Sequence, residues 1–397
     1  MKSTAASPGV KNKGKGSRVL DFSFSKTCGI LTKRNFDPRK ADEGVIVMIK
    51  KIGILTSGGD APGMNAAVVS VARCAAMHGI ELWGIKRGYN GLLGLSEKPE
   101  DDLDVLDLET VLDIADQRGT FLRTARCDEF KDPEVRRKAA ANLREIGIDA
   151  LVVIGGDGSF TGAMKLCELG IPCVGIPGTI DNDLGYTEST LGFDTAVNVC
   201  VEAVRSIRAT SRSHDRPAVV QVMGRHCGDI AMKTAMATGA EMVVVPEMEW
   251  DMDALATRLN SLIAKGNTRA TLVMSENSWD NMKAFDWRKF LNDHGKKIYD
   301  GEPITAERVA SILKRKCNGS EVRATVIGYT QRGAQPTAQD SAFAFEAGHL
   351  AVQLLNRGIT NQAIGIRHGR VFNMPIADAL LMKKHFDRET YELINAL

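Results

Sequence analysis

The chain reads V-V-I-G-G-D-G-S at residues 152–159 and G-I-P-G-T-I-D-N-D at residues 175–183. Each stretch begins as a short apolar run, of the length expected for a buried parallel strand, and ends abruptly in glycine and acidic residues. This pattern predicts strands that deliver polar loops to the carboxyl edge of a sheet, where open α/β sheets bind ligands. We therefore expect the fold and its site to be organised around these two loops.

The first loop surrounds one carboxylate, Asp157, with Gly155, Gly156 and Gly158. Glycine leaves the backbone bare, so an anion such as a phosphate can approach the N–H groups closely. An aspartate placed among phosphates commonly holds a cation such as Mg²⁺. A lone G-G-D-G is also compatible with an ordinary turn.

The second loop places a hydroxyl and two carboxylates, from Thr179, Asp181 and Asp183, on a tight turn with no basic residue between them. On its own, this loop could be a helix cap or a solvated turn. Like charges placed together are unfavourable, and both loops follow apolar strands that are close in the sequence. Their joint occurrence favours a functional site over two unrelated turns.

The composition is that of an ordinary globular protein, with 397 residues, 25% charged and 44% hydrophobic. This length allows one large core or two smaller ones, and we expect two lobes with a cleft. No apolar run approaches the roughly 18 to 20 residues that a membrane span needs, which argues against a membrane role. The eight cysteines are scattered without a C-x-x-C pair, so we expect reduced thiols and a cytoplasmic protein.

The net charge of +2 conceals a difference between the N-terminal 47 residues and the remainder. Residues 1–47 hold 10 Lys+Arg against 4 Asp+Glu, whereas the remainder holds 41 against 45. A basic tail of this kind can bind nucleic acid or address an organelle, but its Gly, Ser and Lys content without a helical period favours disorder. The remainder gives no support for nucleic-acid binding.

Strands and helices alternate along most of the chain, which predicts parallel sheets with right-handed crossovers. The first strand, residues 51–56, leads through S-G-G-D-A-P-G into a helix over 64–77, which is either a further phosphate-binding turn or tight packing of strand on helix. We expect two Rossmann-like three-layer α/β lobes with mostly parallel sheets. The first contains strands near 81–86, 150–154 and 172–176, and the second contains strands near 218–223, 241–246, 270–275 and 324–329.

The sequence also predicts the local structure of three segments between these elements. Residues 88–94 read as a glycine-rich turn, residues 97–107 as a solvated acidic surface segment, and residues 285–293 as helical. Arg126 closes the polar stretch G-T-F-L-R-T-A-R and is either a surface charge or a phosphate contact.

Five motifs, taken in order, resemble those of the ATP-dependent 6-phosphofructokinase family, in its bacterial short-chain form. They are T-S-G-G-D-A-P-G-M-N-A at 56–66, V-V-I-G-G-D-G-S at 152–159, P-G-T-I-D-N-D at 177–183, V-M-G-R at 222–225 and R-A-T-V-I-G-Y-T-Q-R-G at 323–333. The resemblance runs from about Met48 to the C-terminus. Residues 1–47 lie outside it, as a true extension, an expression remnant or a start assigned too far upstream.

The resemblance implies a glycolytic kinase that transfers the γ-phosphate of ATP to the 1-hydroxyl of fructose 6-phosphate, with Mg²⁺. It also implies an ATP-binding lobe of residues 48–192 plus 328–375 and a sugar-phosphate-binding lobe of 193–327 plus 376–397. Carried over by position, Asp181 is the general base, Thr179 contacts the transferring phosphoryl group, and Arg225 stabilises its charge. Asp183 fixes the sugar or the base, and Asp157 holds Mg²⁺.

The remaining positions that the resemblance implies line the two substrate sites. Those of the ATP site are Gly59, Arg126, Cys127, Gly156, Gly158 and Ser159, and those of the sugar-phosphate site are Met223, Gly224, Glu276 and Arg332. Arg216 and Arg323 match arginines that bind the 6-phosphate from a neighbouring subunit, which implies a homotetramer with shared active sites. Tyr329 stands where many members have histidine; a phenol donates a hydrogen bond but brings no positive charge.

The regulatory site of the well-known bacterial members is depleted of positive charge in this chain. Val69, Leu108 and Asn267 occupy positions that are basic in members that bind ADP or phosphoenolpyruvate, while Arg73 and Arg208 remain. Each charged hydrogen bond contributes about 1.5 to 3 kcal/mol. We therefore expect regulation by these effectors to be weakened or lost.

Three alternatives use part of the same pattern. A pyrophosphate-dependent phosphofructokinase usually has an acidic residue and a lysine where this chain has Gly158 and Gly178, so ATP is favoured as the donor. A kinase of another small molecule that shares G-G-D-G, such as an NAD kinase, would not require Met223-Gly224-Arg225. A non-catalytic metabolite sensor would not need the full set of polar residues described above.

Overall fold

The computed structural model describes residues 49–94, 99–283, 298–299, 302–317 and 320–396. The N-terminal extension over residues 1–47 and the helical stretch expected near residues 285–293 lie outside these ranges. No helix within them combines the length and hydropathy needed to cross a bilayer. The seven cysteines among them are all free thiols.

The first lobe is built on a seven-stranded sheet of order β13-β12-β5-β4-β1-β2-β3. The inner strands pair in parallel, while β3 and β13 run antiparallel to their neighbours at the two edges. The strands are β1 (Lys51–Ser57), β2 (Glu81–Ile85), β3 (Leu103–Val105), β4 (Ala150–Gly155), β5 (Cys173–Pro177), β12 (Gln362–Arg367) and β13 (Arg370–Pro375). All six residues of β4 are buried, as expected for a continuous apolar run with helices on both faces of its sheet.

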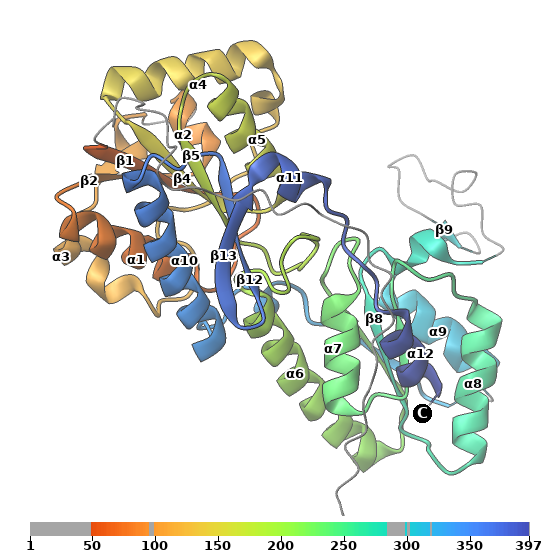
Figure 1. The fold of residues 1–397 in the computed structure, drawn as a ribbon. Coiled ribbons are helices and arrows are strands. Elements are labelled where there is room, and N and C mark those ends of the chain that lie inside the picture. Colours follow the sequence, from red (N-terminus) through yellow and green to blue (C-terminus); the bar gives the residue numbers. More distant parts are fainter. Residues whose placement is uncertain (1–48, 95–98, 284–297, 300–301, 318–319, 397) are drawn as a thin grey trace, which may run out of the picture. The chain divides into compact units, whose positions relative to one another are not determined.

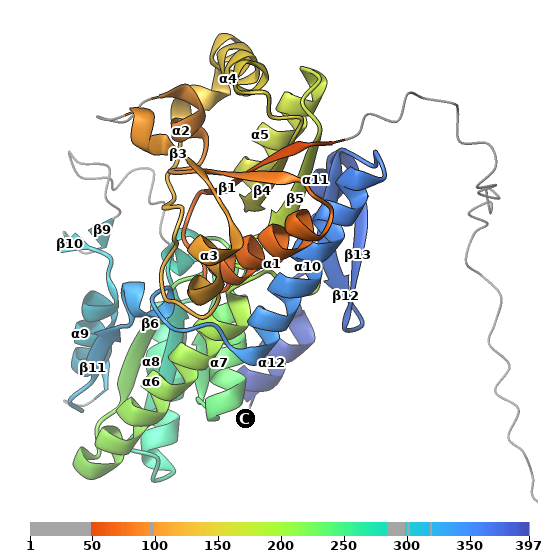
Figure 2. The same ribbon diagram turned by 90° about the vertical axis from the view of Figure 1, so that its left-hand side faces the viewer.

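Helices cover both faces of this sheet. One face carries α1 (Met64–Met77) and α10 (Ala338–Asn356), which lie side by side (Figure 2) and pack on each other. The other face carries α2 (Tyr89–Leu93), α4 (Pro133–Ile146), α5 (Asp157–Glu168) and α11 (Ile376–Leu381). Shorter helical turns are α3 (Leu108–Val111), η1 (Pro99–Asp102), η2 (Leu112–Ile114) and η3 (Asp128–Lys131).

The second lobe is built on a four-stranded parallel sheet of order β11-β6-β8-β7. Its strands are β6 (Ala218–Val222), β7 (Met242–Val244), β8 (Thr271–Ser275) and β11 (Arg323–Val326). One face packs on α6 (Phe193–His214) and α7 (Asp229–Thr238), and the other on α8 (Met252–Ala264) and α9 (Ala306–Lys316). The remaining elements are η4 (Ser278–Asn281), η6 (Gly328–Gln331), the pair β9 (Ile298–Tyr299) and β10 (Glu302–Pro303), and α12 (Arg388–Ala396). The predicted α/β fold with two mostly parallel sheets is confirmed (Figure 1).

One expectation about residues 88–107 is wrong and another holds only in part, with residues 97 and 98 outside the described ranges. The glycine-rich segment forms α2, with Gly88 (φ 59°) before it and Gly94 (φ 63°) after it, so these glycines flank a helix. The acidic segment contributes the edge strand β3; its Asp101 and Asp107 are exposed, whereas Asp102 is only 1% exposed and pairs with Arg87. This ion pair neutralises a charge that burial would otherwise disfavour, and sequence composition alone does not reveal it.

Asp340 connects the two lobes at the start of α6. Its carboxylate is 2% exposed and accepts hydrogen bonds from Gly192 N (3.0 Å), Thr195 N (2.8 Å) and Thr195 Oγ1 (2.6 Å). Gly192 caps α6 without a side chain of its own. Asp340, from α10, therefore satisfies free N–H groups at the amino end of α6.

The C-terminal segment returns from the first lobe to the second. α11 packs against α5 and β13, whereas α12 packs against α7 and β7. We therefore propose that the chain leaves the first lobe after Leu381, a few residues later than the boundary expected between residues 375 and 376. The remaining domain boundaries stay predictions.

Candidate active site

A cleft of about 560 Å³ opens at the carboxyl ends of β1, β4 and β5. The predicted residues that line it are Gly59, Arg126, Cys127, Gly156, Asp157, Gly158, Ser159, Thr179, Asp181, Asp183, Arg225 and Arg332. Further lining residues that sequence reasoning missed include Tyr89, Phe130, Lys131, Arg136 and Lys165. The basic members of this second group lie near the glycine loops and give that part of the cleft a positive character.

The glycine loop leaves the amino end of α5 accessible. Gly156 caps α5, and Asp157 is its first residue. A Cβ added to Gly158 would meet no other atom within 4 Å, so this position faces open space in the cleft. The free N–H groups of the first turn, with the helix dipole, suit a phosphate.

A second glycine turn lies beside the first. Arg332 Nη1 donates a hydrogen bond to Asp60 O at 2.8 Å, and a Cβ on Gly59 would come within 2.9 Å of the same nitrogen. Ser159 is buried and its Oγ donates to Ser57 O at 3.2 Å, which ties the loop after β4 to the loop after β1. Both glycine turns are thus held in place by side chains from elsewhere in the chain.

One wall of the cleft is aromatic. The rings of Tyr89 and Phe130 stack with centroids 4.0 Å apart and an interplanar angle of 13°. Tyr89 Oη donates to Ser159 O at 2.6 Å. Neither ring belongs to a glycine-acid motif, and no signal in the sequence marked them as neighbours of the site.

Asp181 is a buried carboxylate without a full set of partners. It is 8% exposed, and within the described ranges its Oδ1 has no hydrogen-bond partner. Burial raises the pKa of Asp181 to about 6; Asp183 and Glu276 add to the rise, while Arg332 and Arg225 oppose it. Such a group is ionised at neutral pH and is still basic enough to accept a proton.

Asp183 and Asp157 bring further negative charge into the same cleft. Burial raises the pKa of Asp183, and the nearby charge of Asp157 contributes to the rise, whereas Arg225 opposes it. Across the part of the chain that the structure describes, no three His, Cys, Asp or Glu side chains are grouped closely enough to hold a metal ion by themselves. This donor set fits Mg²⁺, which commonly uses one or two carboxylates and takes its other ligands from phosphates and water.

Arg225 reaches the cleft from the loop that follows β6. Its backbone is left-handed (φ 56°), and its N–H donates to Glu276 Oε1 at 2.9 Å. Asn277 Nδ2 donates to Arg225 O at 3.1 Å, and Met223 N donates to Gln331 Oε1 at 3.1 Å. The loop over residues 223–225 is thus fixed by the segments that follow β8 and β11.

Three predicted phosphate-binding residues lie outside this cleft. Arg216 pairs with Glu321 at 2.8 Å, and Arg323 pairs with the same carboxylate. Both arginines stand at the amino ends of β6 and β11, at the opposite end of the sheet from Arg225. Tyr329 is 84% exposed. A single chain therefore does not bring Arg216 or Arg323 to Asp181.

Two of the predicted effector positions, Arg208 and Asn267, form a polar cluster around Glu241. Arg208 donates to both carboxylate oxygens of Glu241, at 2.9 and 3.2 Å, and Asn267 Nδ2 donates at 2.9 Å. Val69 is buried in α1, Leu108 begins α3, and the Arg73 guanidinium lies 5.3 Å from the ring centroid of Phe345. Arg208 and Asn267 are thus engaged with Glu241, and Arg73 lies against Phe345.

Comparison with known proteins gives a consistent result. The family model described as Phosphofructokinase matches residues 51–355. The ATP-dependent 6-phosphofructokinase 1 of Clostridium perfringens is 45% identical over 349 residues, covering 88% of this chain and 99% of that protein. The ATP-dependent 6-phosphofructokinase of Tolumonas auensis is 44% identical over 351 residues, covering 88% and 100%.

Solved structures show the same fold. A phosphofructokinase from Saccharomyces cerevisiae aligns with a TM-score of 0.69 at 34% identity over 83% of this chain, which spans only 45% of the yeast chain. A pyrophosphate-dependent phosphofructokinase from Marinobacter aquaeolei aligns with a TM-score of 0.68 at 20% identity, covering 87% and 91% of the two chains. With a family match over most of its length and relatives of this identity, the chain belongs to the phosphofructokinase family.

Proposed function

We propose that this chain transfers the γ-phosphate of ATP to the 1-hydroxyl of fructose 6-phosphate in glycolysis, with Asp181 as the general base. The observation that carries this proposal is Asp181 itself, a buried carboxylate with an unpartnered oxygen and a pKa near 6 that faces the glycine-lined cleft. A base with this pKa is ionised at neutral pH and accepts a proton without a large penalty.

The remaining groups of the cleft suit in-line phosphoryl transfer. The sugar hydroxyl oxygen attacks the γ-phosphorus, its proton passes to Asp181, and the bond to the oxygen of ADP breaks. Arg225 supplies positive charge where the transferring group carries its negative charge, and Thr179 supplies a hydroxyl as a hydrogen-bond donor. Asp183 lies on the same loop and holds the sugar or the base.

The donor side of the cleft fits ATP because space remains open at Gly158. Phosphates lie against the amino end of α5, near Gly59, Gly156 and Ser159, with Arg126 and Cys127 at the cleft wall. Asp157 would hold Mg²⁺ on the nucleotide phosphates. When bound there, the ion would neutralise negative charge on the phosphates.

The sugar phosphate is bound in part by a second subunit. Met223, Gly224 and Glu276 lie next to Arg225 and contact the sugar, whereas Arg216 and Arg323 stand at the far end of their sheet. A dianionic 6-phosphate needs guanidinium partners of this kind. A symmetric homotetramer, in the cytoplasm, would supply both arginines from a neighbouring chain, while Tyr329 is a further contact to the 6-phosphate.

Replacing Asp181 by asparagine should lower kcat by a factor of about 10² to 10⁴, because an amide cannot accept the proton of the sugar hydroxyl. KM for both substrates should change less than about three-fold, because the isosteric side chain keeps the shape of the cleft. Steady-state kinetics in a coupled assay with ATP, Mg²⁺ and fructose 6-phosphate measure both. The exposed acid of α11, changed by Asp378→Asn, serves as the control. An Asp181→Asn enzyme that keeps more than a tenth of wild-type kcat would remove Asp181 from this role.

The rate should fall as the pH drops through about 6, the pKa to which burial raises Asp181. Only the ionised carboxylate accepts a proton, so activity that depends on Asp181 is present above this pKa and is lost below it. A profile of kcat/KM against pH should show an acid limb with a slope of about one. An acid limb centred near the ordinary pKa of aspartate would contradict the link between burial and proton acceptance.

Placing a carboxylate at residue 158 should abolish the use of ATP. Gly158→Asp projects a negative charge into open space beside the phosphates, and we expect KM for ATP to rise at least about 100-fold. Gly178 is unsuited to such a change, because a Cβ there would come within 2.8 Å of Ile154 and 2.9 Å of Met64. KM for fructose 6-phosphate is the internal control and should stay within about three-fold. Unchanged ATP kinetics would mean that the donor lies elsewhere.

Mixing two inactive variants should restore activity if the site is shared between subunits. In a mixture of Asp181→Ser and Arg216→Ala chains that are allowed to exchange, some interfaces pair an intact Asp181 with an intact Arg216. Activity should then recover to a sizeable fraction of the wild-type value. Mass spectrometry of the intact assembly verifies that subunits have exchanged. Exchange without recovery would show that each chain completes its own site.

A further inference from the structure

The loop over residues 179–185, which we call the base loop, carries the two acids Asp181 and Asp183. The residue between them, Asn182, is not among the residues that line the cleft. Asn182 is 2% exposed, has a left-handed backbone (φ 56°), and is flanked by Asp181 and Asp183, which both line the cleft. A left-handed backbone conformation is unfavourable for residues other than glycine, although asparagine tolerates it better than most. The conformation that presents both acids to the cleft therefore needs support from the surroundings of Asn182.

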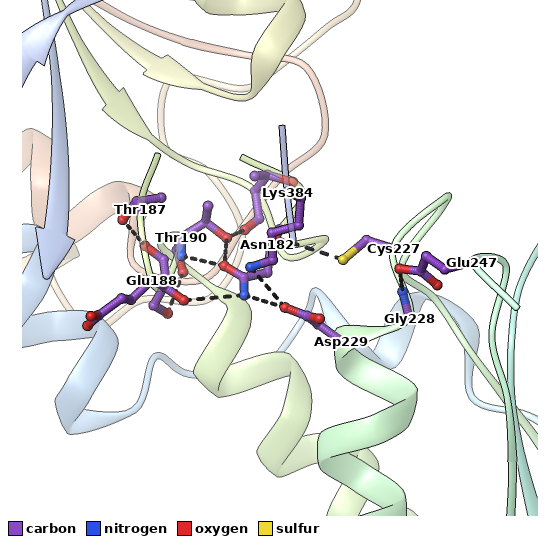
Figure 3. A network of polar contacts seen from close by, with 11 residues as sticks. Asn182, Thr187, Glu188, Thr190, Cys227, Gly228, Asp229, Glu247 and Lys384 are labelled. Carbon is purple, nitrogen blue, oxygen red and sulfur yellow. Dashed lines mark hydrogen bonds and ion pairs between the residues drawn. The ribbon is translucent and has the colours of Figure 1, made fainter. Parts of the chain in front are cut away.

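The Asn182 side chain receives that support from both lobes (Figure 3). Its Oδ1 accepts a hydrogen bond from Thr190 N at 3.1 Å, in the first lobe, and Thr190 Oγ1 in turn donates to Thr179 O at 2.6 Å. Its Nδ2 donates to Asp229 Oδ2 at 2.7 Å, at the first residue of α7 in the second lobe. One amide thus joins the base loop to α7.

Asp229 is in turn held by a lysine from the C-terminal segment. The oxygen that accepts from Asn182, Oδ2, lies 3.0 Å from Lys384 Nζ. The two side chains are 16% and 24% exposed, so the pair is shielded from water more than a surface ion pair. Burial raises the pKa of Asp183, and the charge of Lys384 opposes that rise, which places the lysine close to the base loop.

The same segment also packs directly on the base loop. A Cβ added to Gly185 would come within 2.3 Å of the Lys383 carbonyl carbon and 2.4 Å of Met382 O. Residues 382–387 connect α11, which packs on α5, with α12, which packs on α7. Lys384 therefore stands where the crossing segment meets both the base loop and the amino end of α7.

We propose that Lys384 and Asp229 are positioning residues that act through Asn182 to hold Asp181 and Asp183 in the conformation used for phosphoryl transfer. This inference rests on the proposed role of Asp181. Neither Lys384 nor Asp229 lines the cleft, so neither contacts the reacting atoms. The contacts from Lys384 through Asp229 to Asn182 form a relay. Through this relay, the orientation of Asp181 depends on the positions of α7 and of the crossing segment, residues 382–387. A misplacement of about 1 Å at a reacting group can cost up to about 100-fold in rate.

The relay is tested by Lys384→Met, which keeps the apolar stem of the side chain and removes its charge. We expect kcat to fall about ten-fold while KM for ATP and fructose 6-phosphate stays within about two-fold, since the base is displaced and the binding groups are not. Lys384→Arg keeps the charge and should retain kcat within about two-fold. Lys383→Met, at the exposed neighbouring lysine, is the matched control and should behave as wild type.

A double-mutant cycle with Asp229→Asn separates a relay from independent effects. If Lys384 acts only through Asp229, adding Lys384→Met to Asp229→Asn should lower kcat by less than about two-fold further. Losses that multiply in the double variant, or a kcat of Lys384→Met within two-fold of wild type, would overturn the inference. A loss in Lys383→Met as large as that in Lys384→Met would overturn it as well. Thermal unfolding of each variant shows whether it is folded, and Lys384→Gln, which also removes the charge, provides the test if Lys384→Met is not folded. A wild-type protein without activity on ATP and fructose 6-phosphate would instead contradict the proposed function.

Discussion

The site depends on Asp181, a carboxylate that is charged at neutral pH although water is largely excluded from it. Asp181 is 8% exposed, and burial is the main reason that its pKa rises to about 6. Burial of an acid disfavours its charged form, while Arg332 and Arg225 favour it. The balance leaves a group that is charged at neutral pH and binds a proton readily, which a fully solvated aspartate does not do.

This balance explains why two lobes are needed. The first sheet brings the glycine turns and the acids to one edge, because its parallel strands all end there. Arg225 comes from the loop after β6 in the second sheet, and its position is fixed by Glu276 after β8. A site built on the first lobe alone would hold the acids and the anion-binding turns without the positive charge of Arg225.

The sequence predicted those parts of the fold and site whose cause is local. The continuous apolar run of β4 and the glycines around Asp157 were recognisable because strand burial and bare backbone leave a signature in consecutive residues. The failures have non-local causes. Asp102 is buried and pairs with Arg87, and Asn182 contacts Asp229 from 47 residues away. Neither Asp229 nor Lys384 was singled out from the sequence, because their contacts follow from where α7 and the C-terminal segment lie.

Two shielded carboxylates in this chain illustrate how a structural acid differs from a functional one. Glu241 accepts hydrogen bonds from Arg208 and Asn267 and from Thr271 N at 2.8 Å, and these contacts, against the opposing effect of burial, lower its pKa. Asp181 is also shielded from water, yet one of its oxygens has no partner within the described part of the chain.

Leaving a buried acceptor unpaired costs about 1 to 3 kcal/mol, whereas a saturated carboxylate has no capacity left for a ligand. The unpaired oxygen of Asp181 keeps the capacity to accept a hydrogen bond or a proton from a ligand. At Glu241 the carboxylate is already bonded to Arg208, Asn267 and Thr271, so the two acids lead to opposite expectations for ligand binding at their sites.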